Sequence, residues 1–304
     1  MKNSPIILFT YNRPRHTEMM LKTLSKCELF KDSKLYIFID GPINDYKDKY
    51  LVKKVTLLIR NFKKKFNNVR IYYSKKNQGL FKNLTKGISF VLRKHHSAII
   101  LEDDLKLQKQ FLVFMNKGLD LYKNEKKVLQ VSGYNYPIHI NNNKTYLLNL
   151  TSCWGWGIWR DRWFEFENFL KDKNKINELY IKIKNNKKLK YKFNINNSFD
   201  YLKFLKKQIN LNYNSWGVLF YLYAFDKKLL NLFPAKSLVD NNGFDGTGLH
   251  KSKSNVFNSV NFEKKNNFIF DKNIYANNSN LKKITSFLKD ELSLYNKIKR
   301  IILG

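Results

Sequence analysis

Short apolar segments alternate with amphipathic stretches through the first half of the chain. The apolar segments are rich in β-branched and aromatic residues and lie at residues 5–10, 35–40, 69–74, 98–101 and 128–132. Because they are too short for helices, they predict buried β-strands. The stretches between them repeat apolar residues at helical spacing, which predicts helices over residues 15–25, 45–64, 80–94 and 108–123. This alternation predicts an α/β fold, with a mostly parallel, Rossmann-like sheet flanked by helices.

The second half has a weaker pattern. Residues 168–212 are rich in Lys and Asn and only weakly helical, whereas residues 214–230 predict an apolar, aromatic helix. The closely spaced glycines of residues 240–250 (DNNGFDGTGLH) predict a flexible loop. Residues 279–303 repeat apolar positions at helical spacing. We therefore expect one domain over residues 1–250 and a helical C-terminal extension over residues 251–304.

The charge balance adds a constraint on partners. Lys and Arg number 57 against 24 Asp and Glu, so the net charge of +33 predicts an anionic partner. Nucleic acid is not expected, because zinc-finger spacing, a recognition-helix motif and an RNP-like strand are all missing. The basic C-terminal helix instead predicts contact with an anionic membrane surface, with packing on its own domain as the alternative.

Cysteine content and hydropathy indicate the compartment. Cys27 and Cys153 lie far apart in the sequence and cannot form a disulfide framework. The apolar run near the N-terminus is too short for a signal peptide, and no uncharged run is long enough to span a bilayer. These features predict a cytoplasmic protein that can lie on the inner face of the cell membrane.

The strongest chemical signal is the acidic triplet Glu102-Asp103-Asp104, which directly follows a predicted buried strand. Neighbouring carboxylates repel one another unless a cation offsets their charge, and hard divalent cations bind carboxylate and phosphate oxygens together. The triplet therefore predicts a place where a metal and a diphosphate meet. The alternative is an acidic turn that caps the following helix.

Polar side chains also follow the other predicted strands, where ligands bind in open α/β sheets. An arginine after the first strand suits phosphate oxygens, and a turn that opens a helix suits an anion. Each of these residue patterns alone is typical of a common turn, but their occurrence after successive strands of one sheet indicates a single binding site. The residues are Thr10, Tyr11, Asn12 and Arg13, then Asp40, then Asn77 and Gly79.

The motifs PIILFTYNRPRHTEMMLKTL, IFIDGP, NQGL, AIILEDDL, VSGYN and SCWGWGIWRDRW follow one another in this order. Over residues 4–250 the chain resembles nucleotide-sugar glycosyltransferases of the GT-A fold. It is most similar to the branch related to the N-acetylglucosaminyltransferase that starts complex N-glycans, and to its bacterial relatives. The resemblance implies a donor half at residues 1–135, an acceptor half at residues 136–250, and transfer of a hexosyl or N-acetylhexosaminyl unit with inversion.

The resemblance also implies partners and residue roles. The donor is a nucleoside-diphosphate sugar, with UDP favoured over GDP, and the acceptor is a glycan or lipid-linked glycan of bacterial lipopolysaccharide or capsule. Asp104 binds Mn²⁺ or Mg²⁺, with His250 as a further candidate ligand. The donor contacts are Thr10, Tyr11, Asn12, Arg13, Asp40, Asn77, Gly79, Lys82, Glu102 and Asp103. The sugar and acceptor pocket is lined by Trp154, Gly155, Trp156 and Trp216, although burial in the core is the alternative for a tryptophan.

The catalytic base departs from the family pattern. Relatives place a carboxylate just before a tryptophan, but this chain has Asn214 there, and an amide cannot take a proton from a hydroxyl group. Asp200 or Asp245 could supply the base. Alternatively, the chain is a catalytically silent glycan- or anion-binding protein. A nucleotidyltransferase on a similar sheet and a nucleic-acid-binding module are further alternatives.

Overall fold

The structure, a computed structural model, describes residues 3–140, 143–211, 215–246, 256–258, 260 and 267–292. The strands are β1 (Ile6–Thr10), β2 (Leu35–Ile39), β3 (Val69–Tyr73), β4 (Ser97–Glu102), β5 (Leu105–Leu107), β6 (Val128–Ser132), β7 (Tyr146–Leu148), β8 (Trp156–Trp159), β9 (Leu230–Phe233) and β10 (Val239–Asn241). Within the described residues, eight of them form one sheet in the order β3-β2-β1-β4-β8-β6-β9-β7, and β5 pairs with β10.

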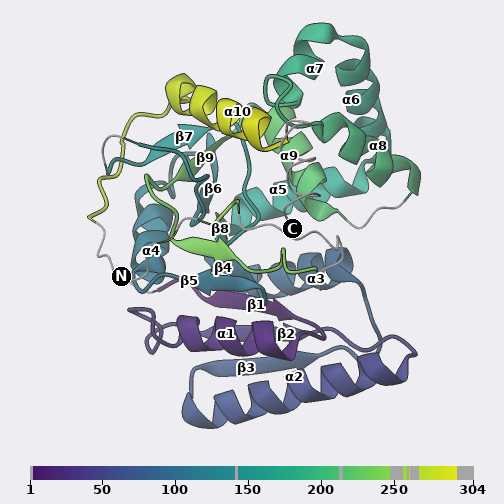
Figure 1. Cartoon of the computed structure of the whole chain (residues 1–304), viewed down its shortest axis with the longest axis vertical. Coiled ribbons are helices and arrows are strands. Elements are labelled where there is room, and N and C mark those ends of the chain that lie inside the picture. The colour runs from purple at the N-terminus through teal and green to yellow at the C-terminus, as the bar shows by residue number, and fades with distance from the viewer. Residues whose placement is uncertain are drawn as a thin grey trace.

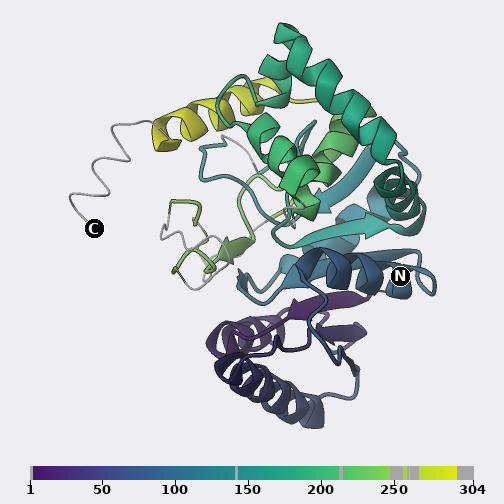
Figure 2. The same cartoon turned by 90° about the vertical axis from the view of Figure 1, so that its right-hand side faces the viewer.

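The helices cover both faces of this sheet and continue beyond it. They are α1 (Pro14–Leu24), α2 (Tyr46–Lys65), α3 (Leu80–Leu92), α4 (Phe111–Leu121), α5 (Arg160–Lys171), α6 (Lys173–Asn185), α7 (Lys187–Phe193), α8 (Tyr201–Leu211), α9 (Trp216–Asp226) and α10 (Asn278–Leu292). Figures 1 and 2 both show α1 and α2 at one end of the molecule and α6, α7 and α8 at the opposite end. The expected α/β class, with a central sheet flanked by helices, is confirmed.

The alternation of side chains along the strands separates two core layers. Ile6 and Leu8 of β1 pack with α1, α2 and α4, whereas Ile7 and Phe9 pack with α3, α5 and α9. Successive strand residues point to opposite faces, so a strand buried on both faces must be apolar throughout. This explains why the first strand reads as the continuous apolar run that the sequence pattern predicts.

The sheet changes character beyond β4. β3, β2, β1 and β4 run parallel to one another, as expected. β8 then runs antiparallel between β4 and β6, and β7 runs antiparallel beside β9. β6 and β9 pair in parallel, so four of the seven strand pairs described in this sheet are parallel and three are antiparallel, which agrees with the expected mostly parallel sheet. The chain forms α5 to α9 between β8 and β9, so β9 joins the sheet beside β6 after a long helical connection, as a parallel pair requires.

The C-terminal region is integrated into the domain. Residues 267–277 run beside β7, with bridges from Lys144 to Ile269 and from Leu147 to Ala276. In α10, Ile284 and Leu288 are buried against the domain. The apolar side of the described part of α10 is thus covered by protein, which favours the alternative of packing on its own domain, whereas contact of its basic side with a membrane surface stays a prediction. The remainder of the predicted helix lies outside the described residues.

Among the residues that the structure describes, no helix combines the length and the apolar character needed to cross a bilayer.

Candidate active site

The acidic triplet and Arg13 meet at the carboxyl edge of the sheet. β1 and β4 are neighbouring parallel strands, so the residues that follow them lie side by side. Arg13 Nη2 donates hydrogen bonds to Asp103 Oδ1 at 2.6 Å and to Asp104 Oδ2 at 3.0 Å. The backbone N–H of Tyr11 donates to the other oxygen of Asp103 at 3.3 Å. The structure therefore brings together the arginine and the acidic triplet, the two sequence signals from which a diphosphate site was predicted.

The charges of this cluster do not cancel. Burial works against the charge of Arg13, but the attraction of Asp103 and Asp104 outweighs it and raises the pKa of the guanidinium. Burial raises the pKa of Asp103, with Arg13 opposing the shift. Burial and the two neighbouring aspartates raise the pKa of Glu102 to about 8. One guanidinium facing two aspartates leaves a net negative charge, which a further cation would offset.

Asp104 is the carboxylate best placed to hold such a cation. One oxygen of Asp104 contacts Arg13, and the other makes no hydrogen bond or ion pair with any described residue. Within the described ranges no group of three His, Cys, Asp or Glu side chains could hold a metal ion. A Mg²⁺-like ion nevertheless needs only one or two protein carboxylates when substrate phosphates complete its shell. Asp104 therefore fits a metal site of this kind, whereas His250 lies outside the described residues.

Asp40 is a buried carboxylate that holds the turn between β3 and α3. It accepts backbone N–H hydrogen bonds from Gly41 at 2.8 Å, Gln78 at 2.9 Å and Gly79 at 3.1 Å. Asn77 Nδ2 donates to the carbonyl of Gly41 at 3.0 Å and completes the link. These bonds satisfy a buried charge with main-chain donors, so Asp40 fixes the beginning of α3. Its expected contact with a nucleotide base stays a prediction, as does that of the exposed Lys82.

Asp48 supports the loop after β1, and the sequence analysis did not identify it. It lies in the first turn of α2 and is 5% exposed. Its carboxylate accepts hydrogen bonds from the hydroxyl of Tyr11 at 2.7 Å, from Asn12 Nδ2 at 2.6 Å and from the N–H of Ile43 at 2.8 Å. In the sequence it is an ordinary acidic residue near a helix N-terminus, and only the fold places it below Tyr11 and Asn12.

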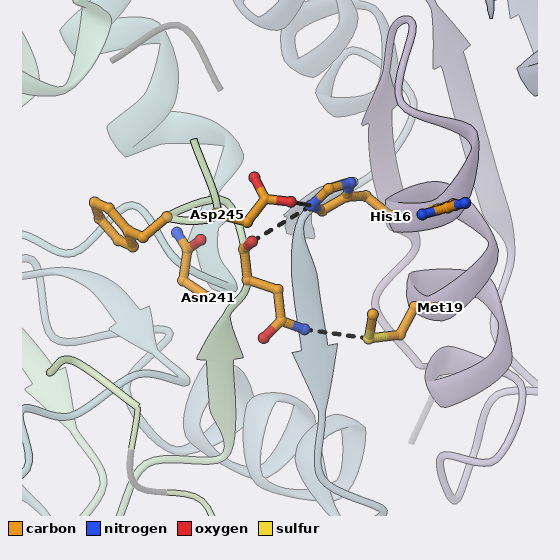
Figure 3. A pocket seen from close by; sticks show the side chains of 7 residues that line it. His16, Met19, Asn241 and Asp245 are labelled. Atoms are coloured by element: carbon orange, nitrogen blue, oxygen red, sulfur yellow. Dashed lines mark hydrogen bonds and ion pairs between the residues drawn. The ribbon is translucent and has the colours of Figure 1, made fainter. Parts of the chain in front are cut away.

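The beginning of the predicted flexible loop is fixed against Asp104. The N–H of Asn242 donates to the carbonyl of Asp104 at 2.8 Å, and a Cβ on Gly243 would clash with Asp104 Oδ2. Figure 3 shows the second attachment, where Nε2 of His16 on α1 lies 3.1 Å from Oδ2 of Asp245. Beside it is a cavity of about 290 Å³. Residues 241–246 therefore lie over Asp104, and residues 247–250 are outside the described part of the chain.

The tryptophans of the Trp/Gly block have different environments. Trp154 is half-buried and meets Tyr134 at 4.5 Å and Phe244 at 5.5 Å between ring centroids, so it contacts the segment that covers Asp104. Trp156 and Trp216 are buried and stack on each other at 5.2 Å. These two rings belong to the core and offer no open face to a sugar. Gly155, which lies between Trp154 and Trp156 in the sequence, has a φ of +63°, which favours glycine.

The candidates for the catalytic base are spread over three places. Asn214 lies outside the described residues. Asp200 accepts the N–H of Lys203 at 3.2 Å and Asn194 Nδ2 at 3.1 Å, so it caps the beginning of α8. Asp245 is exposed and pairs with His16. Both aspartates thus have structural partners, and only Asp245 belongs to the segment over Asp104.

Comparisons with known proteins describe part of the fold only. No protein-family model and no curated protein matches the sequence. A mannosyltransferase from Pyrobaculum calidifontis, solved with GDP-Man and Mn²⁺, aligns with a TM-score of 0.39 and 11% identity over 53% of this chain and 46% of that chain. TarS 1–349 from S. aureus, solved with UDP, aligns with a TM-score of 0.36 and 15% identity over 50% of this chain and 43% of that chain.

The chain therefore spans less than half the length of either solved structure. At this level of similarity the likeness concerns the path of the backbone and does not extend to ligands or activity.

Proposed function

We propose that this protein transfers a sugar from a nucleoside-diphosphate donor to a glycan or lipid-linked acceptor. The observation that carries the proposal is the position of Arg13 between Asp103 and Asp104, where the carboxyl ends of β1 and β4 meet. An arginine fork binds phosphate oxygens, and an adjacent carboxylate with an unpaired oxygen suits a divalent cation. A diphosphate is the ligand that uses both groups together.

In this proposal Arg13 stabilises the negative charge that develops on the departing diphosphate. Asp103 and the backbone of Tyr11 keep the guanidinium in place. Asp104 would hold Mn²⁺ or Mg²⁺, and such an ion supplies Lewis-acid stabilisation of the diphosphate when it is bound. Only Nη2 of Arg13 bonds to the two aspartates, and Nη1 and Nε make no hydrogen bond with a described residue, so these atoms would bind the phosphate oxygens.

The segment over Asp104 has a separate role. Residues 241–246 contact Asp104 on one side and Trp154 on the other, through Phe244. A cover of this kind excludes water from the bond that breaks, which favours transfer to an acceptor over hydrolysis. The half-buried Trp154 then lies where the sugar or the acceptor enters.

The finer parts of the proposal come from the sequence. We retain an inverting reaction, a preference for UDP over GDP, a hexosyl or N-acetylhexosaminyl donor and an acceptor of the lipopolysaccharide or capsule type at the inner face of the membrane. An inverting reaction needs a base opposite the leaving group, and Asp245, Asp200 and the segment around Asn214 remain its candidates.

The decisive experiment measures release of UDP or GDP from a panel of nucleotide sugars, with Mn²⁺ present and after chelation. We expect release and transfer with one donor, loss of both in Asp104→Ala, and retention of both in Asp120→Ala, which removes a carboxylate on α4 that pairs with Lys123. Donor binding without turnover, restored by Asn214→Asp, would identify a silent binding protein. Release of pyrophosphate would identify a nucleotidyltransferase. The proposal fails if no donor binds and Asp104→Ala changes nothing.

A further inference from the structure

A second concave surface lies on the face of the sheet opposite α1 and α2. It is a cavity of about 590 Å³ between α3 and the exposed face of β2 and β3. Its lining includes Phe38, Tyr72, Gln78, Asn83, Lys86 and Phe90. It contains none of the residues of the Arg13–Asp104 cluster, so it is a separate site.

Aromatic rings form the floor and one wall of this cavity. The ring of Phe38 stacks on Phe9 at 5.5 Å and on Tyr72 at 5.0 Å, so a row of rings crosses β1, β2 and β3. β3 is the edge strand, and the row ends at Tyr72, which is half-buried. The ring of Phe90 on α3 contacts that of Tyr72 edge-on, with 5.0 Å between the ring centroids and 65° between the ring planes. The two rings form an apolar corner and not a slot with parallel walls.

One buried polar side chain in this cavity has no partner. Asn83 is 8% exposed, and its backbone N–H bonds to the carbonyl of Gly79 within α3. Its side-chain amide makes no hydrogen bond with any residue that the structure describes. Asn83 lines the cavity, and its amide is not among the polar groups that are fully sealed from solvent without a partner. The amide is therefore available to a ligand that both donates and accepts hydrogen bonds.

We propose that this cavity binds a saccharide unit, which packs on Tyr72 and Phe90 and forms hydrogen bonds with Asn83. Sugar hydroxyl groups donate and accept, so they satisfy both ends of the amide, which a bare phosphate cannot do. A flat nucleobase would need parallel surfaces to stack between, whereas the thicker sugar ring fits an angled corner. Small-molecule sites share this combination of apolar lining and a few convergent polar groups.

The position of the cavity links it to the carboxyl edge of the sheet. Ser74 follows β3 directly and lines the cavity, and so does Gln78, whose N–H bonds to Asp40 at 2.9 Å. An oligosaccharide seated here could extend toward the edge at which the candidate active site lies. Lys86, Arg93 and Glu167 also line the cavity, and the two cations exceed the one carboxylate, which predicts somewhat stronger binding of glucuronic acid than of glucose.

Saturation-transfer NMR on the full chain tests this proposal, with glucose, N-acetylglucosamine, glucuronic acid and uridine as probes. We expect a saccharide signal from the unchanged protein. Tyr72→Ala and Asn83→Leu should each weaken saccharide binding roughly fivefold, the effect of one lost contact. The matched control Tyr50→Ala removes an exposed tyrosine on α2, outside the cavity, and should leave binding unchanged.

The proposal is overturned if no saccharide gives a signal, if uridine alone gives one, or if neither substitution weakens the signal. Thermal unfolding of each variant shows whether it folds, and Tyr72→Leu provides a second, apolar variant on the same edge strand. Asp104→Ala separates the two proposals, because it should abolish nucleotide binding and retain saccharide binding in the cavity. If one of the two proposals is overturned by these measurements, the other is not affected.

Discussion

Arg13 Nη2 lies 2.6 Å from Asp103 Oδ1, although the two residues are 90 positions apart in the sequence. They meet because β1 and β4 are adjacent and parallel, with Phe9 opposite Glu102. Asp103 is 4% exposed, so most of its charge is removed from water. Removal of one partner of such a pair lowers the free energy of unfolding by more than the intact pair adds to it, because an uncompensated buried charge is left behind.

Arg13→Met should therefore lower the free energy of unfolding by about 3 kcal/mol. Urea denaturation measures this loss, and the double variant Arg13→Met, Asp103→Asn should recover most of it. Arg15→Met is the matched control, because Arg15 is an exposed arginine on the same helix. An equal loss in the Arg13 and Arg15 variants would contradict the role assigned to the ion pair.

Asp48 should act as a positioning residue for Tyr11 and Asn12. Asp48→Asn replaces a carboxylate that accepts three hydrogen bonds with an amide that cannot accept all of them. We expect nucleotide binding, measured by calorimetry, to weaken about tenfold, since about 1.4 kcal/mol of positioning is lost. Asp45→Ala removes the N-cap of α2 and should cost about 1 kcal/mol of stability without weakening nucleotide binding.

Gly243→Ala should move the segment that lies over Asp104. A methyl group at this position would clash with Asp104 Oδ2, so either the segment or the carboxylate must shift. We expect sugar transfer to fall at least tenfold while the melting temperature changes little, because the segment lies at the surface. Asn242→Ala is the control, since among the described residues its side chain bonds to the sulfur of Met19 and its backbone bond to Asp104 is kept. Unchanged transfer in Gly243→Ala would show that the segment plays no part in the reaction.

Arg162 should be a main contributor to stability. Its Nη2 donates to the carbonyls of Tyr122, Lys123 and Glu125, where α4 ends, and its guanidinium lies 3.7 Å from the ring centroid of Trp159. Burial lowers its pKa to about 10, which leaves it charged at neutral pH. Arg162→Leu should lower the free energy of unfolding by about 3 kcal/mol in urea.

Lys171→Leu on the same helix is the control for Arg162, because Lys171 is exposed and its side chain donates to Asn168, a neighbour on the same helix. It should change stability by less than about 0.5 kcal/mol. Comparable losses in the two variants would mean that the contacts of Arg162 with the end of α4 contribute nothing.

The local hydrophobic pattern was sufficient to predict the strands and helices in the first half of the chain. The apolar runs at residues 5–10 and 98–101 predicted β1 and β4 because each is buried on both faces. Pro14 marked the beginning of α1, since proline fits the first helical position without losing a hydrogen bond. The short strands β7 and β8 left no such pattern, because three or four residues do not establish an alternation.

The sequence by itself determined the α/β class, the order of the first strands and helices, and the acidic triplet at the end of β4. Only the tertiary structure decided that Arg13 pairs with Asp103 and that Asp48 supports the loop after β1. It also decided that Trp156 and Trp216 belong to the core and that Asn83 lines the cavity beside Tyr72. The physical reason is the distance along the sequence over which each kind of interaction acts. Secondary structure follows from side chains a few residues apart, whereas charge pairing and burial depend on which distant strands and helices become neighbours.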